Sequence, residues 1–189
     1  MFETLDDVRK DAQTRLVGAM EDRRSPMHTP VVATADADAR VMVLRHFAPW
    51  SLRFHTDTRA PKVAVIARNP QIGVLFYDKA AKVQIRVRGQ ARVESEGAVA
   101  QAAWEASDNF ARRCYLGDGP GTLAAGPASG LPEAFEGVEP SDAELAPARA
   151  NFAVLLVEIH QLDWFHLAHD GHRRAVFDLA TGAAQWVTP

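Results

Sequence analysis

The chain has 189 residues, of which 47% are hydrophobic, and this length fits one domain with a few added helices, spanning residues 1–189. A chain of this size buries about 70% of the surface that its unfolded form exposes, so it needs neither a disulfide nor a structural metal. A formal net charge of −3 and a pI of about 6.2 exclude general binding to nucleic acid or to anionic membranes, which requires an excess of basic residues.

The composition also indicates a compartment. The single cysteine, Cys114, cannot form an internal disulfide, which favours a reducing compartment, the cytoplasm. The first residues are polar and charged, so no secretory signal is expected. The longest apolar stretch, residues 152–159, is too short to span a bilayer.

The first predicted element is an amphipathic helix over residues 4–22, within an N-terminal segment of residues 1–24. Thr4 is the expected N-cap, and the acidic residues that follow it suit the positive end of the helix dipole. The apolar residues that share one stripe of this helix are Leu5, Val8, Ala12, Leu16 and Met20.

A strand-rich block follows the helix. Strands are predicted at residues 31–34, 40–47, 52–56, 72–77 and 82–93, and the last of these alternates between apolar and polar side chains. A short helix is predicted before the fourth strand. It begins at Pro61, whose missing N–H costs nothing in a first turn, and ends before Pro70.

Residues 96–150 are predicted as a helical and loop insertion, a candidate lid. It contains one or two helices at 96–116, a Gly/Pro/Ala-rich loop at 117–132 and a short helix within 141–150. Strands return at residues 152–159, 162–169, 172–177 and 184–187, and Asp170-Gly171 is the strongest hairpin signal in the chain.

This pattern predicts the fold class. Mostly antiparallel strands with helices at the periphery predict a mainly β protein, a closed or partly closed barrel. The order of elements is not βαβ, which excludes a Rossmann-type sheet.

The segment 55–62 (HTDTRAPK) is the first candidate for chemistry. A strand ends there and a helix begins, and the backbone N–H groups of a helix start favour an anion. Arg59, Lys62 and the hydroxyls of Thr56 and Thr58 add donors, so the segment is a candidate phosphate site. The alternative is a capped helix start with two solvated basic residues.

Two strands carry polar groups suited to a planar ligand. Arg40 and Arg45 flank an apolar run, but a regular strand directs them to opposite faces, so both contact one ligand only along the strand edge or across a bulge. Gln84 has both a donor and an acceptor and would read the edge of a heterocycle. The alternative is two solvated arginines for the first strand and a solvated barrel exterior for the second.

Two other signals lead to no site. Residues 117–122 (GDGPGT) lack the lysine that a phosphate-binding P-loop requires. His166, His169 and His172 lie near Asp170 but match no recognised ligand motif, so no metal is predicted.

Taken in order, the motifs resemble those of the pyridoxamine 5′-phosphate oxidase-like family of FMN-binding split barrels. The resemblance runs from about residue 25 to the C-terminus. The motifs that carry it are RVMVLR at 40–45, FHTDTRAPK at 54–62, NPQIGVLFY at 69–77, VQIRVRGQARV at 83–93, and a terminal block with Trp164 and HRRAVF at 172–177.

The resemblance implies a Greek-key split β-barrel and a homodimer with FMN at its interface. Residues 40–45 would lie beside the flavin and contact it partly through their backbone groups. Backbone contacts do not alternate between the faces of a strand, so Arg40 and Arg45 can both contact one ligand although their side chains point to opposite faces. Trp164 and Arg174 would come from the other subunit. The cofactor-binding residues are Arg40, Val41, Met42, Val43, Arg45, His55, Thr56, Arg59, Lys62, Gln84, Trp164 and Arg174.

The resemblance also implies an FMN-dependent oxidoreductase acting on a small molecule, in which the flavin performs the redox chemistry. Arg45 and Arg112 are the candidates for orienting an anionic substrate.

The sequence departs from the family pattern at several positions. Pro61-Lys62 replaces an Arg-Lys pair, and Val176 stands where an arginine is usual. Where the oxidases hold the phosphate of the vitamin, this chain has Trp104, Asp108 and Arg112, and an aspartate would repel a phosphate. The pattern therefore favours FMN binding over oxidation of pyridoxamine phosphate itself. The alternatives are a non-catalytic FMN carrier or redox sensor, a haem or deazaflavin binder on the same barrel, and a structural domain without a ligand.

Overall fold

The computed structural model describes residues 2–189, so Met1 of the predicted N-terminal segment lies outside the described residues. The first element is α1 (Leu5–Glu21), as predicted. The Thr4 hydroxyl accepts a hydrogen bond from the backbone N–H of Asp7, and the Asp7 carboxylate accepts one from the backbone of Thr4. This reciprocal capping box satisfies two backbone donors that the helix start leaves without intrahelical partners.

Four short strands follow: β1 (Val31–Thr34), β2 (Ala39–Val41), β3 (His46–Ala48) and β4 (Ser51–Asp57). The continuous strand predicted at 40–47 is wrong, because the reciprocal hydrogen bonding of a ladder stops between β2 and β3. The N–H groups of Met42 and Leu44 donate to the carbonyls of Pro30 and His28 at 3.0 and 2.9 Å. Pro30 has no N–H to donate in return, so a regular ladder cannot continue there.

The next three elements match the prediction closely. α2 (Pro61–Arg68) precedes β5 (Gln71–Asp78), which pairs antiparallel with β6 (Val83–Glu94). Every second residue of β6 from Val83 to Val87 is buried, so the residues between them point to the opposite face.

The predicted insertion contains short helices and no strand. These are α3 (Gly97–Glu105), α4 (Asn109–Arg112), η1 (Arg113–Tyr115), η2 (Glu133–Phe135), α5 (Asp142–Leu145) and η3 (Ala146–Asn151). The loop predicted at 117–132 is confirmed, and α5, which Ser141 caps, lies within the short helix predicted at 141–150.

The C-terminal strands are β7 (Phe152–His166), β8 (Arg173–Asp178) and β9 (Ala184–Trp186). β7 joins two predicted strands into one, because the intervening residues stay extended: the His160 carbonyl accepts from Leu179 at 2.8 Å and Gln161 lies opposite Asp178. The predicted hairpin is confirmed, since β7 and β8 pair antiparallel around the turn that contains Asp170-Gly171.

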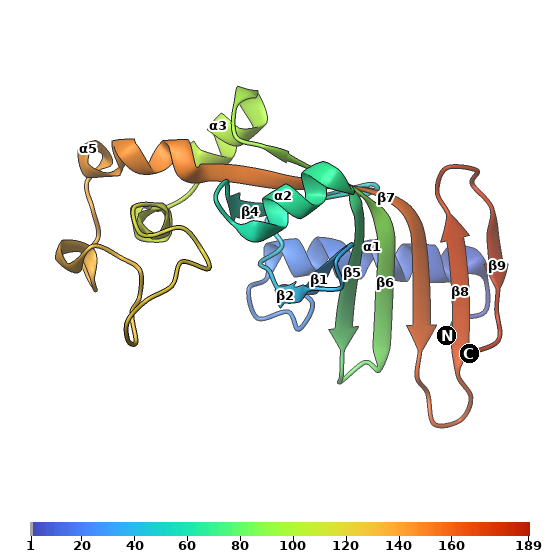
Figure 1. The fold of residues 1–189 in the computed structure, drawn as a ribbon. Helices are drawn as coiled ribbons and strands as arrows, with labels where there is room; N and C mark the ends of the chain where they lie inside the picture. The colour runs from blue at the N-terminus through green and yellow to red at the C-terminus, as the bar shows by residue number, and fades with distance from the viewer. Residues whose placement is uncertain (1) are drawn as a thin grey trace. The chain divides into compact units, whose positions relative to one another are not determined.

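Within the described residues, nine strands form one sheet in the order β2-β1-β5-β6-β7-β4-β3, with β8 paired to β7 and β9 paired to β8 (Figure 1). This confirms a mainly β fold with peripheral helices. The sheet is not closed, because its path begins at β2 and ends at β3.

The chain divides into two compact units. Unit 1 comprises residues 1–54, 69–91 and 156–189, and unit 2 comprises residues 55–68 and 92–155. The unit 1 core lies between α1 and one face of the sheet, where Val8, Leu16, Phe76, Ile85 and Trp164 are fully buried. No helix of the described residues is long and apolar enough to cross a membrane.

Candidate functional site

The predicted site residues divide between the two units. Residues 40–45 lie in unit 1 together with Gln84, Trp164 and Arg174. Unit 2 contains His55, Thr56, Arg59, Lys62 and Arg112.

Arg40, on β2, is anchored at the turn between β1 and β2. Its guanidinium donates to the Val32 carbonyl at 3.3 Å and to the Thr34 hydroxyl at 3.0 Å, and it pairs with Asp38. The guanidinium of Arg40 is therefore engaged within its own hairpin. If Arg40 binds a ligand, it does so through its backbone.

The segment after β2 alternates in the way the sequence indicated. Met42 and Leu44 are buried, whereas Val41 is 64% exposed and Arg45 is also exposed. The Arg45 N–H donates to the Arg53 carbonyl at 2.9 Å, which fixes the backbone. Among residues 2–189 the Arg45 guanidinium forms no hydrogen bond or ion pair, so its charge is available to an anion.

Gln84 lies near the start of β6, opposite Tyr77 of β5. Its side chain is half-buried on the face opposite the core, and within the described part of the chain its amide has no hydrogen-bond partner. An amide that presents both a donor and an acceptor on an outward face is suited to the edge of a heterocycle.

Trp164, on β7, points the other way. Its side chain is fully buried, its indole N–H donates to the Asp11 carboxylate of α1 at 2.8 Å, and its ring packs against Phe2 with 4.6 Å between centroids. The ring is therefore enclosed within unit 1, and its contact with a flavin of a second subunit stays a prediction.

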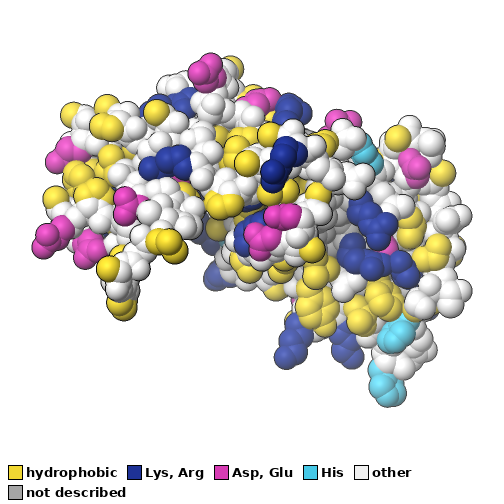
Figure 2. All heavy atoms as spheres, viewed as in Figure 1, with side chains coloured by type: hydrophobic (Ala, Val, Ile, Leu, Met, Phe, Trp, Pro, Cys, Tyr) yellow, Lys and Arg dark blue, Asp and Glu magenta, His cyan; other side chains and the backbone are white. Residues whose placement is uncertain are grey.

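Arg174, on β8, is held by Asp163 of β7. The carboxylate accepts from Arg174 Nε at 3.0 Å and from Nη2 at 2.8 Å, and it also pairs with Arg86 of β6. Hydrogen bonding to Asp163 raises the pKa of Arg174. Figure 2 shows basic side chains gathered over β6 to β8 on this face, and the three charges sum to one net positive charge there.

Asp163 was not among the residues predicted from the sequence. The available signal was an acidic residue inside an otherwise apolar run, LDWF, where a buried carboxylate requires a cationic partner.

In unit 2, the predicted phosphate corner contains an ion pair that was not predicted from the sequence. The Arg59 guanidinium binds both oxygens of the buried Asp57 carboxylate, at 3.0 and 2.7 Å, and donates to the Gly117 carbonyl at 2.9 Å. Hydrogen bonding to Asp57 raises the pKa of Arg59. The charge of Arg59 is therefore compensated before any phosphate arrives.

The remaining donors of the corner lie beside this pair. Thr56 is buried at the end of β4, and among the described residues its hydroxyl makes only a long 3.5 Å contact with the Asp57 carbonyl. Lys62 lies in the first turn of α2, which contains no acidic residue. A first turn without carboxylates suits an anion, because the helix dipole is left uncompensated.

Residues 117–121 lie against this corner. An added Cβ at Gly119 would be 3.3 Å from Arg59 Cβ, and one at Gly121 would be 3.6 Å from the Pro61 ring. Part of the predicted lid is therefore packed against the start of α2.

The other two unit 2 residues belong to an aromatic cluster. The His55 ring packs edge-on against Phe152 with 5.0 Å between centroids, and Trp104 lies 5.3 Å from the same ring. Arg112 stacks over Trp104 and lines a cavity of about 290 Å³. Its guanidinium already donates to the carbonyls of Trp104 and Glu105 and to the side chains of Asn109 and Asp142, so it braces the insertion.

Residues 10–95 match the family described as pyridoxamine 5′-phosphate oxidase, FMN-binding domain. No curated protein matches the chain. Among solved structures, the chain is similar to a pyridoxamine 5′-phosphate oxidase-related, FMN-binding protein from Nostoc punctiforme, with a TM-score of 0.71, 20% identity, and coverage of 95% of this chain and 97% of that chain.

Two further structures are similar. PhzG from Burkholderia lata, in complex with tetrahydrophenazine-1-carboxylic acid, has a TM-score of 0.68 and 17% identity, with 98% and 92% of the two chains covered. A protein from Clostridium acetobutylicum related to general stress protein 26 has a TM-score of 0.55 and 12% identity, with 92% and 96% covered. At these identities the structures show that the fold is shared, which confirms the predicted split-barrel class.

Proposed function

Because residues 10–95 of this chain belong to the pyridoxamine 5′-phosphate oxidase FMN-binding domain family, we propose that the protein is an FMN-dependent oxidoreductase acting on a small molecule. The family match confirms the predicted resemblance and the predicted cofactor, FMN. One observation carries the catalytic part of the proposal. Arg45 lies within the matched segment, exposed and without a partner among the described residues, where it is able to orient an anionic substrate.

Unit 2, taken by itself, has the groups that suit the phosphate of FMN. Lys62, the Thr56 hydroxyl and the start of α2 would bind the phosphate, because they offer a cation, a hydroxyl and a helix dipole without a competing carboxylate in the first turn. Gln84 would hydrogen-bond the edge of the flavin ring. When bound, FMN supplies a two-electron acceptor and donor, and the protein supplies orientation and exclusion of water.

We also propose that the protein acts as a homodimer in the cytoplasm. Val41, on β2, and Tyr77, on β5 opposite Gln84, are exposed hydrophobic residues, and exposed apolar groups of this kind suit a subunit interface. The Cys114 thiol is exposed and would remain reduced in that compartment. The single-domain organisation of residues 1–189 remains part of this proposal.

A second candidate function is FMN binding without turnover, as in a carrier or redox sensor. It is favoured by Arg112, whose donors are used inside the insertion and not offered to a substrate. The two functions differ in one experiment: anaerobic mixing of the FMN-loaded protein with amine and carboxylate donors bleaches the flavin only if the protein is an oxidoreductase.

The cofactor itself is tested by the absorption spectrum of the purified protein and the mass of the compound released on denaturation. We expect a flavin spectrum and the mass of FMN. A colourless protein that takes up no added FMN, or one that releases haem or a deazaflavin, would contradict the proposal.

A further inference from the structure

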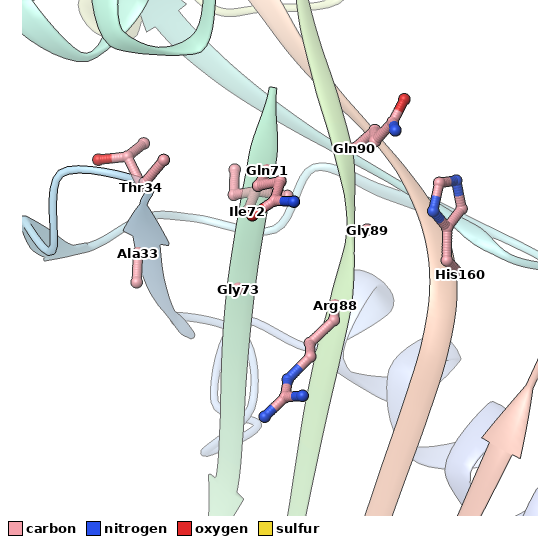
Figure 3. A pocket seen from close by; sticks show the side chains of 10 residues that line it. Ala33, Thr34, Gln71, Ile72, Gly73, Arg88, Gly89, Gln90 and His160 are labelled. Atoms are coloured by element: carbon pink, nitrogen blue, oxygen red, sulfur yellow. The ribbon is translucent and has the colours of Figure 1, made fainter. Parts of the chain in front are cut away.

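A hollow of about 520 Å³ lies over β1, β5 and β6 of unit 1, and none of its lining residues is among those assigned above to FMN. Its floor is a row of residues in register: Ala33 of β1 lies opposite Gly73 of β5, and Gly73 lies opposite Arg88 of β6. The row therefore runs from two residues with little or no side chain to an arginine. Figure 3 shows the Arg88 side chain extending along the strands beside Gly73.

The hollow exists because Gly73 has no side chain. An added Cβ at Gly73 would meet only the Val87 carbonyl oxygen, at 3.9 Å, and its backbone is not in the left-handed region. Gly89, by contrast, is required by packing, because its Cβ would lie 1.9 Å from the Glu158 carbonyl oxygen. Neither packing nor backbone geometry requires glycine at position 73, and a strand glycine of this kind often marks the approach of a ligand.

The charge of the hollow is positive. Within residues 2–189, Arg88 forms no hydrogen bond or ion pair, whereas Arg86, two residues earlier on the same face, is paired with Asp163. No aspartate or glutamate lines the hollow. An unpaired guanidinium beside an open space binds a carboxylate or phosphate through two parallel hydrogen bonds.

Polar side chains that are not carboxylates surround the rest of the hollow. Gln71 and Gln90 lie opposite each other in the β5–β6 ladder at one end, and His160 of β7 lies at the rim (Figure 3). The amides and the imidazole offer donors and acceptors to the polar edge of a ring. No bulky side chain stands on the floor at Ala33 and Gly73, so a flat ring is able to lie over these two residues.

We propose that this hollow binds a small flat anion, a carboxylate or phosphate monoester carried on an aromatic or heteroaromatic ring. Arg88 binds the anionic group, and the ring lies over Ala33 and Gly73. The volume is within the range of about 300–1,000 Å³ that is typical of small-molecule sites. This site is distinct from the proposed flavin site and does not depend on it.

The test uses three probes on the purified FMN-loaded protein: benzoate, phenyl phosphate and the uncharged benzamide. Binding is followed by the backbone amide NMR signals of Gly73 and Gly89 and by calorimetry. We expect at least one of the two anions to bind and to shift both glycine signals, with benzamide binding more weakly. The anion that binds more tightly identifies the carboxylate or the phosphate monoester as the preferred class.

Two variants separate the site from adventitious binding. Arg88→Gln should weaken anion binding about tenfold or more and leave benzamide unchanged, since only the charge-assisted contacts are lost. Gly73→Val, which fills the hollow, should abolish binding of all three probes. The control Arg23→Gln removes the same charge from an exposed position and should change nothing.

Flavin content and thermal unfolding of each variant complete the experiment. Both variants should retain FMN and fold, because neither residue is part of the proposed cofactor site. The inference is overturned if neither anion binds, if Arg88→Gln binds the anions as the wild type does, or if either folded variant loses FMN. The last result would assign the hollow to the flavin, whereas a colourless wild type would refute the proposed function alone.

Discussion

Asp163 and Arg174 face each other across the β7–β8 pair, and the carboxylate accepts two hydrogen bonds from the guanidinium, at 3.0 and 2.8 Å. The same carboxylate also pairs with Arg86, so one acidic residue joins three neighbouring strands. Arg174, which the family resemblance predicted as a site residue, is thereby held in place by Asp163, which the resemblance did not indicate.

Asp163→Asn should destabilise the protein. The substitution leaves two guanidinium groups side by side without the carboxylate between them, and hydrogen bonds to charged groups contribute about 1.5–3 kcal/mol each. We expect the free energy of unfolding to fall by about 1–3 kcal/mol in urea titrations. The control Glu158→Gln removes the same charge from an exposed position on β7 and should have little effect. Equal effects of both variants would show that the pairing contributes nothing specific.

Lys62→Ala and Arg59→Ala should differ in FMN retention. Arg59 is already bound to Asp57 and Gly117, so its loss should alter the loop more than the cofactor. Loss of Lys62 should weaken FMN binding about 10- to 100-fold, as expected for a charge-assisted phosphate contact of about 1.5–3 kcal/mol. Fluorescence titration of the apoprotein measures both constants. Arg68→Ala, at the other end of α2, is the matched control, and an Arg59 effect as large as that of Lys62 would contradict this assignment.

Gln84→Ala should weaken FMN binding about 2- to 10-fold, because one neutral hydrogen-bonding group of about 0.5–1.5 kcal/mol is lost. The flavin absorption bands should also shift, since the ring edge exchanges an amide for water. Gln185→Ala removes an exposed strand glutamine elsewhere and should change neither property. If the spectrum and affinity of the Gln84 variant equal those of the wild type, Gln84 does not contact the flavin.

Gly89→Ala and Gly73→Ala should have opposite effects on stability, although both glycines lie on paired strands. At Gly89 the new methyl would lie 1.9 Å from the backbone oxygen of Glu158, so β6 and β7 would have to separate, at a cost of about 3 kcal/mol or more. At Gly73 the nearest atom is 3.9 Å away, so alanine should be neutral or stabilising by about 0.5–1 kcal/mol. Thermal unfolding of the two variants tests the pair, and a severe loss in the Gly73 variant would refute the open space at that position.

His166 should make stability depend on pH. Burial, and then the charge of Arg173, lower the pKa of His166, and its Nδ1 is buried without a hydrogen-bond partner among the described residues. The unfolded chain therefore takes up a proton at a higher pH than the folded protein does. Stability should be constant above the unfolded value of about 6.5 and fall as the pH decreases from there toward the lowered folded value.

Urea titrations between pH 8 and pH 5 measure this dependence. His166→Gln should flatten it, whereas His169→Gln, at an exposed position of the following turn, should leave it unchanged. An identical pH profile for wild type and His166→Gln would exclude His166 as the cause.

The sequence predictions were correct for the features that residues close together in the chain determine. α1 with its Thr4 cap, the hairpin at Asp170-Gly171 and the alternation of β6 were predicted correctly, because capping, turn geometry and side-chain alternation are set by neighbouring residues. The ion pair of Asp57 and Arg59 is equally local and was present in the sequence, but Arg59 was considered only as a donor to a phosphate, and that role stays a prediction.

The sequence by itself determined a mainly β fold, the ends of most elements and the likeness to an FMN-binding family. Only the tertiary structure decided that Pro30 interrupts the ladder before β3, that Asp163 holds Arg86 and Arg174, and that Arg88 lies unpaired beside Gly73. The physical reason is that these features depend on which strands become neighbours and in what register. Strand pairing joins residues far apart in the chain, and no local pattern of side chains specifies it.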